Sequence, residues 1–147
     1  MKQALIQLFT RDLGRLKVEM ESYRNYENIW LTEYDISNSA GNLCLHLVGN
    51  LNHFIGAVLG KNGYLRKRDE EFSQKNIPLP ELVDQVARTM DMLKRTLNEM
   101  KEDDFYAPFP ITFNNQDCTT DFVLIHLAGH LNYHLGQINY HRRFLDK

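Results

Sequence analysis

Apolar residues recur every three or four positions along four segments of the chain, which is the spacing of amphipathic helices. The first segment runs from about Lys2 to Glu27, and the second runs from about Asn38 to Leu59. The third begins at Pro80, a favoured first position of a helix, and its apolar stripe continues to Met100. The fourth begins near Thr119 or Thr120, either of which can cap a helix, and continues to about Leu145. The pattern predicts an all-α fold, a four-helix bundle in a single domain over residues 1–147.

The lengths and compositions of the connections indicate how the predicted helices are arranged. Residues 61–79 separate the second and third helices and are long enough to cross from one end of a bundle to the other. Such a crossover would leave these two helices parallel, unlike a bundle built only of hairpins. Between the third and fourth helices, the stretch FYAPFPITFNNQDC mixes prolines, aromatic residues and β-formers. It predicts a loop with a short hairpin that turns at Asn114-Asn115.

Composition and charge narrow the class of protein. The apolar and charged fractions, 43% and 24%, are those of a globular domain, and the net charge of -2 gives no basic surface for nucleic acid. The two cysteines, Cys44 and Cys118, are far apart and form no CxxC pair, which fits a reducing compartment. The sequence contains no signal-peptide pattern and no apolar run of membrane length. We therefore expect a soluble cytoplasmic protein without a membrane or nucleic-acid partner.

The histidines are the strongest chemical signal. Two of the six lie in the second predicted helix and four in the fourth: His46, His53, His126, His130, His134 and His141. His130 and His134 fall within the apolar arc of the fourth helix, and a spacing of four residues stacks them on one face. A single buried histidine is usually a hydrogen-bonded core residue. Two stacked imidazoles opposite a second histidine-bearing helix make a shared metal ion an equal alternative to that core role. Spacing does not decide whether His46 or His53, which flank Asn50, supplies the third ligand.

Three stretches carry a resemblance to a known family. HLNYHLGQI (residues 130–138) resembles the HxxxHxGQI signature near the end of DinB-family proteins, and NLCLHLVGNLNHFI (residues 42–55) resembles the helix that carries their first histidine. RDEEF (residues 68–72) resembles a string found in small bacterial DinB-like proteins. The resemblance to the DinB/YfiT-like family implies an up-down-down-up bundle with one divalent metal ion, usually zinc or nickel, bound by His46, His130 and His134. Three imidazoles with an open position would match a catalytic site.

Several further residues are candidates for roles around this site. Gln137 is a candidate for orienting a ligand imidazole, and His53 and His126 are candidate acid/base groups, as alternatives to surface or core roles. Asn50 is a candidate hydrogen-bonding partner of substrate or water. The basic residues between Lys61 and Arg68 would attract an anionic ligand or simply form a solvated loop. Two structural interpretations remain: Arg68 would pair with Asp69 or Glu71 to fix the crossover, and Cys44 would lie in the core.

The function follows only from the resemblance. Some relatives use bacillithiol or mycothiol, which implies an S-transferase that presents a small thiol to an electrophile. The alternatives are a metal-dependent hydrolase and a non-catalytic, stress-related metal-binding or dimerisation module. No acidic residue adjoins His130 or His134 in the sequence to act as the base of a hydrolase, which favours thiol transfer. The resemblance also implies a homodimer. An aromatic cluster is the candidate contact or, alternatively, a cover for the bundle end: Tyr23, Tyr26, Ile29, Trp30 and Tyr34.

Overall fold

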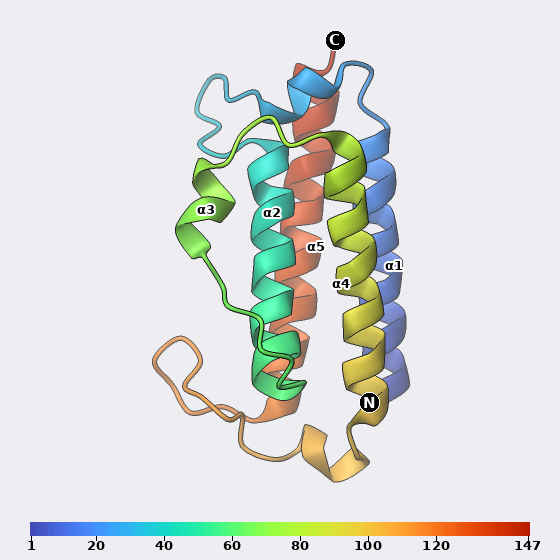
Figure 1. Cartoon of the computed structure of the whole chain (residues 1–147), viewed down its shortest axis with the longest axis vertical. Coiled ribbons are helices and arrows are strands. Elements are labelled where there is room, and N and C mark those ends of the chain that lie inside the picture. The colour runs from blue at the N-terminus through green and yellow to red at the C-terminus, as the bar shows by residue number, and fades with distance from the viewer.

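Four long helices form the body of the protein. In the computed structural model, which describes residues 1–147, they are α1 (Lys2–Glu21), α2 (Ala40–Leu51), α4 (Leu79–Glu99) and α5 (Thr120–Leu145) (Figure 1). A π-helical segment, η2 (Asn52–Leu59), continues α2 without a break. The 3₁₀ segments are η1 (Tyr26–Trp30) and η3 (Glu102–Phe105). The all-α bundle predicted from the apolar pattern is confirmed. None of its helices has both the length and the apolar character needed to span a lipid bilayer.

The long helices are arranged up-down-down-up. In Figure 1, α1 and α5 run in one direction and α2 and α4 in the other. α1 packs against α4 and α5, and α2 packs against the same two helices, so α1 and α2 occupy opposite corners of the bundle. The crossover returns the chain along the outside of α2, as its length predicts. It also contains a short helix that the sequence pattern did not predict, α3 (Arg68–Ser73).

The crossover changes the environment of α2. Every residue of α2 is buried, whereas the other long helices keep an exposed face. The reason is that α3 packs against the side of α2 that would otherwise face water. At Gly49 the two segments are so close that a Cβ atom would overlap the carboxylate of Glu71. A polar segment of the crossover is thus held directly against the helix that carries His46.

The first helix is shorter than the predicted Lys2–Glu27. It ends at Glu21, and the chain turns into η1 because the carboxylate of Asp146, just beyond α5, accepts hydrogen bonds from the backbone amides of Arg24 (2.6 Å) and Asn25 (3.1 Å). The Asn25 side chain then caps η1 by accepting a bond from the Glu27 amide. Contacts with the far end of the chain therefore stop a helix whose own sequence would allow it to continue.

The aromatic cluster after α1 mainly closes the end of the bundle. Tyr23 and Ile29 are buried, and the Trp30 ring occupies the space where Gly41 lacks a side chain. Only Tyr26 and Tyr34 are exposed. The cluster as a whole is therefore not a free apolar surface.

The predicted hairpin turn before α5 is present. Phe113 and Gln116 exchange two backbone hydrogen bonds (2.8 and 3.0 Å), and Asn114 and Asn115 between them both have positive φ. Asparagine tolerates this left-handed conformation better than most residues. The Phe113 ring packs against Phe54 of η2 at a centroid distance of 5.1 Å. The hairpin is thereby attached to the lower end of α2 and η2.

Candidate metal centre

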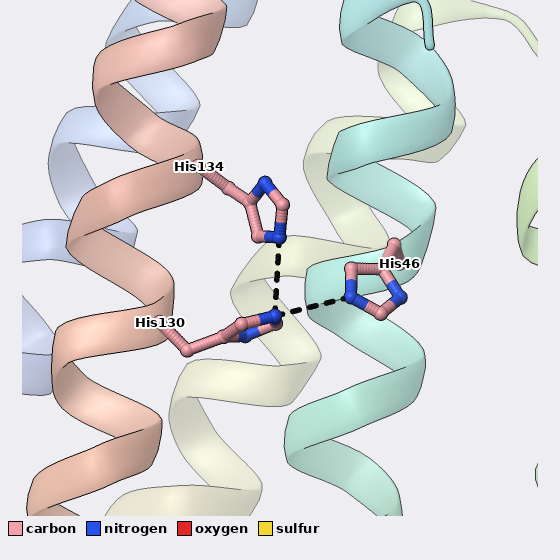
Figure 2. A group of neighbouring side chains, drawn as sticks. All are labelled: His46, His130 and His134. Atoms are coloured by element: carbon pink, nitrogen blue, oxygen red, sulfur yellow. Dashed lines mark hydrogen bonds between the residues drawn. The ribbon is translucent and has the colours of Figure 1, made fainter. Parts of the chain in front are cut away.

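Three imidazoles meet between α2 and α5, as Figure 2 shows. The Nε2 atom of His130 lies 3.2 Å from Nε2 of His46 and 3.1 Å from Nε2 of His134. One ring nitrogen from each of the three residues lies within 4.8 Å of the others. A tetrahedral ion with metal–nitrogen bonds of about 2.0–2.1 Å would place its ligand nitrogens about 3.3 Å apart. Two of the three separations are already close to that value.

The helices themselves create this convergence. His130 and His134 are one turn apart on α5, so their side chains leave the same face of the helix. His46 projects from the antiparallel α2, which packs directly against α5. His46 is buried and the two α5 histidines are partly buried. The cluster therefore sits at the edge of the core, within reach of solvent.

The three imidazoles carry too few N–H hydrogens to satisfy the contacts among their Nε2 atoms. Nδ1 of His46 donates to the Glu71 carboxylate (3.0 Å) and Nδ1 of His134 donates to Oε1 of Gln137 (2.7 Å). In a neutral imidazole whose Nδ1 donates, Nε2 carries no proton. A proton on Nε2 of His130 could be donated to Nε2 of His46 or to Nε2 of His134, but not to both. The other ring nitrogen, Nδ1 of His130, is buried without a partner. A cation, in contrast, would accept all three Nε2 lone pairs, so the residues present fit a metal ion.

The electrostatics of the cluster keep His130 and His134 neutral. Burial, together with the neighbouring histidines, lowers the pKa of His130 to about 4. Burial also lowers the pKa of His134, although the hydrogen bond to Gln137 partly opposes this shift. Metal ions bind the neutral form of imidazole. At neutral pH these two rings do not need to lose a proton before binding.

Glu71 orients His46 from the crossover. Its carboxylate receives Nδ1 of His46 and two further hydrogen bonds of 2.8 Å from Arg66. Burial by itself would raise the pKa of Glu71, but the hydrogen bonds from Arg66 and His46 lower it, so the group is ionised. A carboxylate on the far nitrogen of a ligand histidine fixes the tautomer and the ring orientation.

The arginine in this contact differs from the prediction. Glu71 does fix the crossover, but its partner is Arg66. Arg68 forms no ion pair and instead places its guanidinium over the Phe72 ring, 5.3 Å from its centroid. Arg68 is the first residue of α3 and lies over Phe72, whereas Arg66 precedes the helix and reaches the buried carboxylate. Spacing within the RDEEF string did not distinguish these geometries.

Of the other predicted site residues, three lie at or beside the cluster and one does not. Gln137 contacts His134, as a residue that orients a ligand should. His126 and Asn50 line a cavity that also contains His46 and His130. His53 is not part of the cluster; its ring packs edge-on against Phe54.

The two remaining polar groups of interest are structural. His141 is buried in the last turns of α5, where Nε2 donates to the Leu31 carbonyl (2.9 Å) and Nδ1 accepts from the Tyr23 hydroxyl (2.8 Å). Cys44 is fully buried, and burial raises the pKa of its thiol to about 12, so it is a core residue rather than a nucleophile. The core role that the sequence favoured for Cys44 is confirmed.

Two cavities flank the three histidines. One, of about 370 Å³, touches His46 and His130 and is lined by the crossover arginines and the hairpin. The other, of about 470 Å³, touches His134 and is bordered by Tyr133, Tyr140 and Phe144. The first cavity is polar and cationic and the second is aromatic. The cluster thus has space on both sides for small molecules of different chemistry.

The fold and this cluster define a helical-bundle protein with a three-histidine group able to hold a metal ion. Over residues 9–147 the chain matches the family described as "Protein of unknown function (DUF1572)", and it belongs to that family. It is similar in structure to the conserved protein of a locus from Enterococcus faecalis, known from a crystal structure. That match has 16% identity and a TM-score of 0.77, and it covers 99% of this chain and 96% of the other. At this identity the likeness establishes the fold alone. No curated protein matches the chain in sequence.

Proposed function

We propose that the protein is a DinB-like, metal-dependent S-transferase that joins a low-molecular-weight thiol to an electrophile. His46, His130 and His134 would hold one divalent ion, with zinc and nickel the leading candidates. The convergence of three Nε2 atoms that cannot all be satisfied by protons carries this proposal. A metal ion held by three imidazoles would supply a Lewis acid with an open position, which lowers the pKa of a bound thiol.

The position of the acidic side chains favours a thiol over water as the nucleophile. Glu71 is the only carboxylate hydrogen-bonded to the cluster, and it lies on the Nδ1 side of His46, away from the three Nε2 atoms. It is also occupied by Arg66. No acidic residue lines the cavity beside His46 and His130. A zinc hydrolase needs a base to deprotonate its water, whereas a thiol ionises far more readily.

The chemical step requires little from the protein beyond positioning. The thiol loses its proton, and its sulfur forms a bond to the electrophilic carbon while the leaving group departs with its bonding electron pair. His126, which lines the same cavity as His130, is the candidate acceptor of the thiol proton. Free cysteines and abundant small thiols are both features of the reducing cytoplasm, where we expect the reaction to occur.

His126 also supports a second candidate, a metal-dependent hydrolase. An imidazole beside the cluster could take a proton from water as well as from a thiol. The third possibility, a non-catalytic metal-binding module, would use the cluster to stabilise the bundle.

One experiment separates these functions. Protein loaded with zinc or nickel is incubated with a chlorinated arene and a panel of small thiols, and in parallel with ester and amide substrates and no thiol. Thioether formation that depends on both metal and thiol supports the transferase. Hydrolysis without thiol supports the hydrolase, and inactivity on both panels by fully loaded protein supports the binding module. His130→Ala is the control, because it should abolish any metal-dependent turnover.

A further inference from the structure

The cavity beside His46 and His130 has the composition of a specific binding site. Its volume is about 370 Å³, and it lies where α2, α5, the crossover and the hairpin meet. Phe54, Phe113 and Leu127 form its apolar part. A cavity of this size accommodates a small molecule next to the Nε2 cluster.

One polar side chain in this cavity lacks a partner. Asn50 is 8% exposed, and its Oδ1 atom is buried without a hydrogen bond. It lies one turn after His46 on α2, so both side chains leave the same face of the helix. A buried amide oxygen without a partner costs free energy that a bound ligand with a hydrogen-bond donor would recover. Asn50 therefore indicates a polar ligand rather than an apolar one.

The charge of the cavity indicates the sign of that ligand. Arg66 is neutralised by its two hydrogen bonds to Glu71, but Arg68 has no ion pair. Arg68 is held in place because its guanidinium lies over Phe72, whose ring in turn contacts the His46 ring at 5.0 Å. The cavity thus presents one uncompensated guanidinium and no carboxylate. A guanidinium binds a carboxylate with two parallel hydrogen bonds, and a single positive charge matches a monoanion better than a phosphate dianion.

We propose that this cavity binds the carboxylate of the thiol substrate, with Arg68 pairing to the carboxylate and Asn50 bonding to a second polar group. The inference rests on the proposed function for the identity of the thiol, but the cavity's preference for carboxylate is independent of turnover. The substrate class is then a small, carboxylate-bearing thiol rather than a neutral one.

The test is binding to zinc-loaded protein by isothermal titration calorimetry. The probes are 3-mercaptopropionate and 2-mercaptoethanol, which share a thiol on a two-carbon chain but differ in carboxylate and hydroxyl. We expect about tenfold tighter binding of 3-mercaptopropionate. Arg68→Gln should remove that preference, whereas Asn50→Ala should retain it, because 3-mercaptopropionate carries no second polar group for Asn50 to bind. Lys67→Gln is the matched control, because Lys67 is an exposed neighbour that pairs with Glu70 (3.2 Å), and it should retain the preference.

Two outcomes would overturn the inference. Equal binding of the two thiols to the wild type would remove the carboxylate site. If Lys67→Gln and Arg68→Gln lost the preference for 3-mercaptopropionate equally, the preference would come from general surface charge and not from a specific site. A retained preference with no thioether formation would leave the carboxylate site standing and reject S-transfer, so the two proposals can fail separately.

Discussion

Glu71 accepts a hydrogen bond from Nδ1 of His46 across 3.0 Å, although the two residues are 25 positions apart and lie on different helices. The carboxylate also rests on the α2 backbone at Gly49, where there is no side chain to exclude it. The crossover is therefore part of the candidate metal centre and does more than connect two helices. Substitution of Gly49, which is not itself a candidate ligand, should therefore change the affinity for the metal.

Gly49→Ala should weaken metal binding without removing a ligand. The added methyl group overlaps the Glu71 carboxylate, so either the carboxylate or α3 must move. Loss of a residue that orients a ligand histidine typically lowers metal affinity about 10- to 100-fold. Gly14→Ala is the control, because a Cβ atom there meets nothing within 4 Å, and it should leave the affinity unchanged. Competition with a chromophoric chelator measures both affinities.

A second variant guards against misfolding as the explanation. Glu71→Gln keeps the size of the side chain but removes the charge that pairs with Arg66 and holds His46. It should reproduce the loss of affinity, whereas Glu70→Gln, at the exposed neighbouring position, should not. Wild-type affinity in both Gly49→Ala and Glu71→Gln would show that Glu71 does not orient a metal ligand.

The ligand assignment predicts a clear division among the histidines. His130→Ala and His134→Ala should each remove most of the bound metal, and His46→Ala should weaken binding to a similar extent. His126→Ala and His141→Ala should keep one ion per chain, because neither residue belongs to the cluster. Metal content after gel filtration, measured by mass spectrometry, gives the stoichiometry. A His46→Ala/His134→Ala double variant that still carries a full complement of metal would disprove the assignment.

The sequence predicted the parts of this structure that depend on local periodicity. The four helices, the parallel α2 and α4 and the turn at Asn114-Asn115 all follow from residue spacing and turn chemistry. The stacking of His130 and His134 follows from a spacing of four on one helix. By contrast, the choice of His46 over His53 depends on which of the two faces α5, and spacing along α2 is compatible with both.

The tertiary contacts were not predictable in the same way. α1 stops early because Asp146, more than a hundred residues later, binds the backbone after it. α3 is too short to show an apolar period, and three successive acidic residues at its start gave no indication that Glu71 alone would be buried. The pairing of Glu71 with Arg66 depends on how the crossover is laid against α2, which is determined by packing.

Removal of the metal should destabilise the protein without unfolding it. A metal that binds only the native state stabilises it by about 2.7 kcal/mol when its concentration is a hundredfold above Kd. For a protein of this size, that corresponds to a melting temperature lower by roughly 5–10 °C after chelation. The large apolar core does not involve the histidines, so the helical circular dichroism spectrum should persist. Loss of helix on chelation would mean that the ion is structural and would reject the catalytic interpretation.

His141 should make the metal-free protein less stable in mild acid. Burial lowers the pKa of His141 in the native state below its ordinary value of 6.5. As the pH falls through about 6.5, the unfolded chain gains a proton at this position that the native protein does not, so the unfolding free energy falls. The stability is fully present above that pH. Urea denaturation at pH 7.5 and pH 5.5 should show the loss, and it should be smaller in His141→Gln. An equal pH dependence in the two proteins would exclude His141 as a source.

An exposed apolar stripe along α5 is now the better candidate for the expected homodimer contact. Its five large side chains are each more than half exposed, and they recur at helical spacing on the side opposite the core: Phe122, Ile125, Tyr133, Tyr140 and Phe144. Gly129 and Gly136 lie between them on the same side, where a Cβ atom would meet nothing, so a second helix could approach closely. With about 200 Å² per aromatic side chain, the stripe offers more than half of the roughly 800 Å² that each partner of a standard interface buries.

We expect a two-fold, antiparallel pairing of α5 helices about a point between Gly129 and Gly136, because an isologous contact must be complementary to itself. Phe122 of one chain would then lie beside Phe144 of the partner subunit. Phe122→Glu/Phe144→Glu would bring like charges together at both ends of the stripe and should give a monomer by light scattering at tens of micromolar. Tyr26→Ala/Tyr34→Ala, which changes the only exposed members of the aromatic cluster after α1, should remain a dimer. A monomeric wild type would exclude the dimer, and dissociation only in the tyrosine variant would return the contact to that cluster.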